Sequence, residues 1–132
     1  MRSQNEIGDD FEKEVALYYQ VHADYVDINR RIKGRSGVIH ELDIYAVKKG
    51  LFGITETAVE CKYKNNGDKV TQEEVANFVV KLLDTCVRRG DFVTNSDFTN
   101  YARLLGNFHR LRLVEGRSWN MLCQRYGLPQ KH

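Results

Sequence analysis

The sequence predicts an α/β domain in which helices cover both sides of a central mixed sheet. Segments with the 3.6-residue period of helices alternate with segments in which apolar residues recur at every second position. Two of the alternating segments follow each other directly near the middle of the chain, as the strands of a hairpin do. Helices stand on both sides of this hairpin, and a strand-helix-strand succession follows it. The predicted order is α-β-β-β-α-β-α-β-α.

The composition is that of one globular domain spanning residues 1–132. With 42% apolar and 29% charged residues, the chain can bury its own core and is too apolar to be disordered. The net charge of +2 neither demands nor excludes a nucleic acid partner. No stretch approaches the roughly 18 apolar residues of a membrane span. Three cysteines without zinc-like spacing indicate reduced, mostly buried thiols, so we expect a cytoplasmic protein.

The first helix is expected from Gly8 to about Gln20. Steps of about 100° per residue gather its apolar side chains into one stripe, which contains Phe11, Val15, Ala16, Tyr18 and Tyr19. Glu12 falls inside this stripe, whereas Lys13 and Glu14 fall outside it, where charges normally lie. An acid on the buried side needs a partner or a metal ion, so Glu12 is a candidate functional residue. The alternative is a structural acid favoured by the helix dipole.

A strand is expected at about 25–32, and it runs into the most basic stretch of the chain. Its cations are Arg30, Arg31, Lys33 and Arg35. Such cations could bind the phosphate backbone of a nucleic acid. The alternative is that they only keep a surface loop solvated.

The central hairpin is expected to pair strands at about 38–48 and 54–62, joined by a turn at 48–50. The first strand places Leu42, Ile44 and Ala46 on one parity and Glu41, Asp43 and Tyr45 on the other. In the second strand Glu60 and Lys62 share a face, roughly 7 Å apart. We expect one buried face and one solvated, acidic face. Two carboxylates across a hairpin suit a divalent cation, and a lysine beside them suits an anionic substrate.

The second half of the chain supplies the remaining elements. Residues 71–74 form a capping box, after which apolar residues recur at helical spacing as far as Cys86. A short strand is expected at 92–94, and residues 95–97 cap the next helix. A strand at 110–115 and a last helix, which Gly127 and Pro129 end, complete the order.

Five segments of this pattern, in order, carry a family resemblance that covers about residues 8–126. They are Gly8-x-x-Phe11-Glu12, Gly37 through Asp43, Glu60-Cys61-Lys62, Val93-Thr94-Asn95-Ser96 with the helix after it, and Leu113 through Trp119. Together they resemble the PD-(D/E)XK nuclease superfamily and, within it, the Mrr-like restriction endonuclease branch. The chain departs from many Mrr-like members by carrying Glu60 where they have glutamine, which supports metal binding. It also has a less glycine- and aspartate-rich lead into Asp43, which leaves the substrate open.

The resemblance implies a restriction-endonuclease-like, three-layer α/β/α fold and metal-dependent hydrolysis of DNA to 5′-phosphate and 3′-hydroxyl ends. Asp43 and Glu60 would be the main metal ligands, with the main-chain carbonyl of Cys61 as a further one. Glu12 would bind a metal-held water or a second ion, and Lys62 would position the attacking water and screen the phosphate. Mg²⁺ is the expected ion, and Mn²⁺ the expected substitute.

Two further residues are possible auxiliary groups. Glu41 shares the parity of Asp43 but could lie on the rim of the sheet, and Gln72 sits in a capping box, where a structural role competes.

Three alternatives to a double-strand endonuclease stay open at this point: a structure-selective nuclease such as a Holliday-junction resolvase, a non-catalytic DNA-binding module on the same fold, and a nuclease acting on RNA. Double-strand cleavage by a single-site domain would favour a homodimer on DNA, with no membrane involved.

Overall fold

A computed structural model describes residues 3–130, so residues 1–2 and 131–132 of the expected domain lie outside the described residues. The elements are α1 (Gln4–His22), β1 (Tyr25–Lys33), β2 (Ile39–Gly50), β3 (Gly53–Lys62), α2 (Gln72–Thr85), β4 (Arg89–Thr94), α3 (Asn100–Phe108), β5 (Arg112–Val114) and α4 (Gly116–Tyr126). The strands form one sheet in the order β1-β2-β3-β4-β5, antiparallel from β1 to β3 and parallel from β3 to β5. The predicted element order and the mixed sheet are confirmed.

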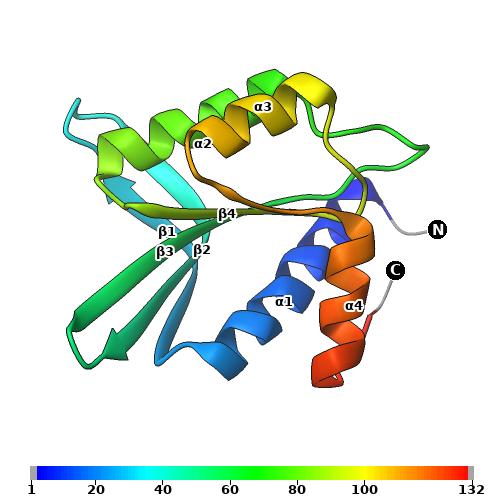
Figure 1. The fold of residues 1–132 in the computed structure, drawn as a ribbon, viewed down its shortest axis with the longest axis horizontal. Coiled ribbons are helices and arrows are strands. Elements are labelled where there is room, and N and C mark those ends of the chain that lie inside the picture. Colours follow the sequence, from blue (N-terminus) through cyan, green and yellow to red (C-terminus); the bar gives the residue numbers. More distant parts are fainter. Residues whose placement is uncertain (1–2, 131–132) are drawn as a thin grey trace.

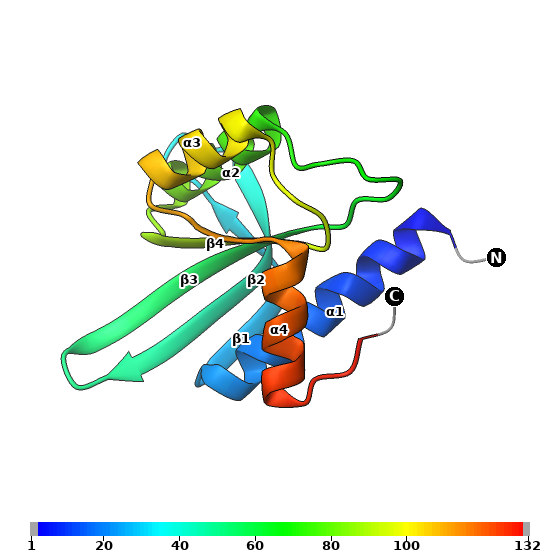
Figure 2. The ribbon, with the colours of Figure 1, turned by 45° about the vertical axis from the view of Figure 1, so that its right-hand side comes forward.

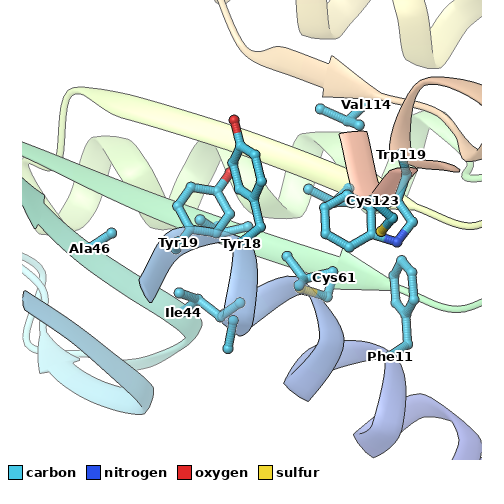
Figure 3. Packing of buried hydrophobic residues seen from close by; sticks show 13 residues of the cluster. Phe11, Tyr18, Tyr19, Ile44, Ala46, Cys61, Val114, Trp119 and Cys123 are labelled. Atoms are coloured by element: carbon cyan, nitrogen blue, oxygen red, sulfur yellow. The ribbon is translucent and has the colours of Figure 1, made fainter. Parts of the chain in front are cut away.

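Helices α2 and α3 lie on one side of the sheet, and α1 and α4 lie on the other (Figures 1 and 2). Each side has its own apolar core. One is built around Phe11 and Trp119 (Figure 3), and the other around Phe78 and Phe92. The three-layer prediction is therefore confirmed, but the expected solvated face of the hairpin is wrong. Tyr45 and Ala58, which lie on that face, belong to the core under α2.

Helix α1 is longer than expected and buries an unexpected acid. It starts at Gln4, where the Ser3 hydroxyl accepts a hydrogen bond from the Glu6 amide at 3.2 Å. The prediction that Glu14 lies among the exposed charges is wrong, because it is only 3% exposed and accepts a 2.9 Å hydrogen bond from Trp119 Nε1. This bond ties α4 to α1.

The alternation of side chains between the two faces of strand β2 is reversed at Asp43. Leu42 belongs to the core under α2, whereas Ile44 and Ala46 belong to the core under α1, so the expected common face of these three residues is wrong. The partner strand is irregular at the same level. Asn29 falls between the pairs Ile28↔Ile44 and Arg30↔Leu42 and has a left-handed φ of 55°. Asparagine tolerates this conformation better than most residues, and the kink lets the two halves of the β1–β2 ladder face different layers.

The β2–β3 hairpin projects from the body of the molecule (Figure 2). Its turn is later than expected, because Gly50 still pairs with Gly53 and the exposed residues Leu51 and Phe52 form the tip. Gly53 has a φ of 133°, which a residue with a side chain would strain to adopt.

The three cysteines are free, as expected for reduced thiols. Cys61 and Cys123 are buried, but Cys86 at the end of α2 is exposed. Within residues 3–130, no helix has the length and apolar character to cross a bilayer.

Candidate active site

The candidate site forms where strands β2 and β3 separate. Their ladder runs from the turn to the pair Ile44↔Val59 and stops one step before Asp43 and Glu60. Asp43 Oδ2 instead accepts a 2.9 Å hydrogen bond from the main-chain N–H of Cys61. A carboxylate thus fills the place of a main-chain acceptor and is fixed against the Glu60-Cys61-Lys62 segment.

Three carboxyl groups influence one another at this point. Burial, reinforced by the negative charge of Asp43, raises the pKa of Glu60 to about 7. Burial also raises the pKa of Asp43, although the Cys61 N–H and nearby lysines oppose the shift. Glu12 reaches the group from α1, and burial together with the charges of Asp43 and its neighbours raises its pKa to about 7. The structure therefore brings the three predicted acids into one electrostatic cluster that favours a bound cation.

One oxygen of this cluster lacks the hydrogen-bond donor that a buried carboxylate oxygen normally has. Glu60 Oε1 is buried without a hydrogen-bond partner among the described residues, and the Glu60 side chain is 13% exposed. A buried carboxylate oxygen without a hydrogen-bond donor is costly unless a cation neutralises it.

The available donors suit a hard divalent ion. No group of three or more His, Cys, Asp or Glu side chains within residues 3–130 could hold an ion by itself. The donors to consider are therefore Asp43, Glu60 and the Cys61 carbonyl. Mg²⁺ takes oxygen ligands and usually keeps several waters, so one or two carboxylates with substrate oxygens suffice, and this donor set fits it.

Lys62 is held beside the cluster by helix α2. Its Nζ lies 3.6 Å from Glu74 Oε2, while Lys64 Nζ lies 2.8 Å from Glu74 Oε1. Glu74 also closes the capping box with Thr71. Burial alone would raise the pKa of Glu74, but Lys64 and the Thr71 N–H outweigh it and leave the pKa lowered. The sequence analysis singled out Gln72 on this turn. That residue is exposed, and Glu74 is the one that contacts Lys62.

Lys81, two turns further along α2, was not predicted. Its Nζ lies 3.5 Å from Glu60 Oε1 and donates a 3.0 Å hydrogen bond to the main-chain carbonyl of Glu41. The predicted auxiliary residue Glu41 thus contacts Lys81 through its backbone, and its side chain is exposed. The only sequence signal was the spacing of seven residues from Glu74, which places both side chains on one side of the helix.

The end of β4 holds the backbone of the Lys62 strand. The Thr94 hydroxyl donates a 2.7 Å hydrogen bond to the Lys62 carbonyl. The Asn95 side chain accepts a hydrogen bond from the Lys64 N–H and donates one to the Lys64 carbonyl, both at 2.7 Å. Through these contacts, residues 93–96 have a structural role beside the site.

The basic segment after β1 divides into two parts. Arg30 is half-buried, with its guanidinium 4.7 Å from the centre of the Tyr45 ring and 3.3 Å from Asp27 Oδ2. The other three predicted phosphate-binding cations, Arg31, Lys33 and Arg35, are exposed.

The loop that carries Arg35 is fixed to the end of α2. Asp84 accepts hydrogen bonds from the Ser36 hydroxyl at 2.7 Å and the Ser36 N–H at 2.9 Å, and His40 Nε2 lies 2.7 Å away. The bonds from Ser36, followed by that from His40, lower the pKa of Asp84 to about 2. A Cβ at Gly34 would stand 2.0 Å from Asp84 Oδ2, so only glycine leaves room for this carboxylate.

Solved structures show the same fold at low sequence identity. A protein of unknown function, AF1548, is 19% identical, with a TM-score of 0.78 over 91% of this chain and 68% of its own. The DNA modification-dependent restriction endonuclease AspBHI is 15% identical, with a TM-score of 0.62 over 97% of this chain and 39% of its own. The MspJI restriction endonuclease, solved with a 27-mer oligonucleotide, is 18% identical, with a TM-score of 0.57 over 90% of this chain and 28% of its own.

The two named enzymes are thus much longer than the part this chain spans. No curated protein matches the sequence. The family model for the Mrr catalytic domain, described as a restriction endonuclease, matches residues 4–123. This match covers nearly the whole chain, including both strands of the site, and the protein therefore belongs to the Mrr-type restriction endonuclease family.

Proposed function

We propose that this protein is a metal-dependent DNA endonuclease that hydrolyses phosphodiester bonds to 5′-phosphate and 3′-hydroxyl ends. The observation that carries the proposal is the buried Glu60 oxygen without a hydrogen-bond partner among the described residues, inside a cluster of three carboxyl groups with raised pKa values, next to Lys62. Membership of a restriction endonuclease family supports it.

Asp43, Glu60 and the carbonyl of Cys61 would hold Mg²⁺ or, in its place, Mn²⁺. When bound, the ion would supply Lewis acidity at the scissile phosphate and stabilise the charge on the leaving oxygen. The Cys61 N–H holds the Asp43 carboxylate beside the Glu60-Cys61-Lys62 segment. Glu12, with a pKa of about 7, would hold a water or take up a proton near neutral pH.

Lys62 would act on the substrate after leaving Glu74. Its side chain is 40% exposed and its ion pair with Glu74 is long, at 3.6 Å, so an incoming phosphate can compete for the ammonium. Lys62 would then position the attacking water and screen the phosphate charge. Glu74 keeps Lys64 as its closer partner, at 2.8 Å.

DNA is the proposed partner, bound along its backbone by Arg31, Lys33 and Arg35. Residues 1–132 would work as one nuclease domain with one site, and a homodimer would place one site on each strand of a duplex. Such a protein would act in the cytoplasm.

The test is a cleavage assay on supercoiled, linear, single-stranded and branched DNA in Mg²⁺, with EDTA as the metal-free arm. We expect Lys62→Ala and Asp43→Asn to abolish cutting and Lys69→Ala, at an exposed loop position, to retain it. Binding without cutting in both Mg²⁺ and Mn²⁺ would refute the proposal in favour of a non-catalytic DNA-binding module. Cutting confined to branched DNA would identify a structure-selective nuclease.

A further inference from the structure

Lys81 stands between helix α2 and the carboxylate cluster. Its side chain is 26% exposed, and its ammonium has two contacts on the sheet, the Glu41 carbonyl at 3.0 Å and Glu60 Oε1 at 3.5 Å. The first contact is a hydrogen bond. The second is an ion pair without hydrogen-bond geometry, since Glu60 Oε1 has no hydrogen-bond partner. The ammonium therefore neutralises the charge on this oxygen without donating a hydrogen bond to it.

Lys81 is also a stronger electrostatic neighbour of the cluster than Lys62. It opposes the raised pKa of Glu60 and of Asp43, and in both cases its charge counts for more than that of Lys62. The reason lies in the geometry. Lys62 is drawn toward Glu74, whereas the contacts of the Lys81 ammonium within residues 3–130 are with Glu41 and Glu60 alone.

A role in anchoring α2 does not account for this position. Anchoring requires only the bond to the Glu41 carbonyl, which any donor of the right length could make. The contact with Glu60 places a full positive charge on the oxygen that a divalent ion would use, and an ion at that oxygen must approach the ammonium or displace it.

We propose that Lys81 is a positioning residue that serves as the built-in counter-cation of the site: it holds Glu60 when no metal is bound and competes with a divalent ion for that carboxylate. This inference rests on the metal-dependent function proposed above. Its consequence is that the protein without DNA binds metal weakly, so that the phosphate of a bound substrate, as an extra ligand, favours loading of the ion.

The expected size of the effect follows from Coulomb's law. A unit charge about 6 Å from a divalent ion, screened as in water, changes the affinity for that ion on the order of tenfold. A lower effective dielectric would enlarge this change.

The experiment titrates the DNA-free protein with Mn²⁺ and follows free Mn²⁺ by electron paramagnetic resonance. We expect Lys81→Gln and Lys81→Met to bind Mn²⁺ about tenfold more tightly than the wild type and Lys81→Arg to stay within about twofold. Glutamine keeps a donor for the Glu41 carbonyl without the charge, which separates charge from anchoring. Lys48→Met is the matched control, because Lys48 donates to the His22 carbonyl at 2.9 Å on the projecting hairpin, away from the carboxylates.

Thermal melting of each variant checks folding before the titration. Unchanged or weaker Mn²⁺ binding in folded Lys81→Gln overturns the inference while leaving the proposed function intact. If the wild type and both neutral variants bind no Mn²⁺, and no DNA is cut, the proposed function fails and this inference fails with it. An equal gain in Lys48→Met also overturns it, since the effect would then come from net charge alone.

Discussion

Replacing Glu60 by glutamine is expected to stabilise the metal-free protein at alkaline pH and to bring no gain in stability at acidic pH. The folded state raises the pKa of Glu60 from 4.5 to about 7. Below pH 4.5 the group is protonated in both folded and unfolded chains and has no effect on stability. As the pH rises from 4.5 to 7 the unfolded chain loses its proton first, so stability falls, and above pH 7 the full cost is present.

The size of this cost follows from the shift in pKa. A shift of about two and a half units corresponds to roughly 3 kcal/mol of destabilisation above pH 7. The buried amide of glutamine has its own desolvation cost of about 1–2 kcal/mol. We therefore expect Glu60→Gln to gain about 1–2 kcal/mol at pH 8, a rise in Tm of roughly 5 °C.

The assay is urea unfolding in EDTA at pH 5 and pH 8 for the wild type, Glu60→Gln and Glu73→Gln. Glu73 is an exposed acid at the start of α2 and controls for the loss of one negative charge. The wild type and Glu73→Gln should lose stability between the two pH values, and Glu60→Gln should lose distinctly less. Equal losses in all three proteins would refute the reasoning that burial of the ionised Glu60 carboxylate destabilises the folded protein.

Three further substitutions test the local structure by urea unfolding. Trp119→Phe removes the donor to the buried Glu14 and should cost about 1–3 kcal/mol, and a change below about 0.5 kcal/mol would show that the bond is unimportant. Gly34→Ala places a Cβ against Asp84 and should lower stability by at least about 1 kcal/mol. It should also loosen the loop that carries Arg35, which would be seen as faster proteolysis there. An unchanged digest would contradict the close packing. Asn29→Val puts a β-branched residue at positive φ and should cost about 1–3 kcal/mol, whereas a neutral result would mean that the kink is not required.

Two matched variants separate these effects from general sensitivity to mutation. Gly8→Ala adds a Cβ in helix α1 where nothing lies within 4 Å, so it should be neutral or slightly stabilising. Asn29→Gly keeps access to positive φ and should retain most of the stability that Asn29→Val loses.

Local rules were enough to predict the main parts of the candidate site. The two-residue period of a strand places Glu60 and Lys62 on one face, and the hairpin brings Asp43 to them, so no distant contact had to be known. The helical stripe likewise pointed to Glu12. The capping box at the start of α2 and the end of α4 at Gly127 were also predicted correctly.

The missed features depend on partners that are far apart in the sequence or on a single backbone torsion. Glu14 is buried because Trp119 arrives 105 residues later, and Lys81 reaches Glu60 only because α2 packs over the sheet. The reversed parity of Leu42 occurs beside the positive φ of Asn29 in the neighbouring strand. Periodicity assumes a regular strand, and it fails where one residue leaves the regular conformation.

The separation of β2 and β3 at Asp43 also has a mechanical consequence. Glu12 comes from the helical layer on one side of the sheet and Lys81 from the layer on the other, yet both act on the carboxylates at this opening. A ligand that neutralises these carboxylates would change the electrostatic interactions of α1 and of α2 together. The opening in the sheet thus couples the two helical layers instead of separating them. Binding at the site should therefore slow hydrogen exchange in both helices at once.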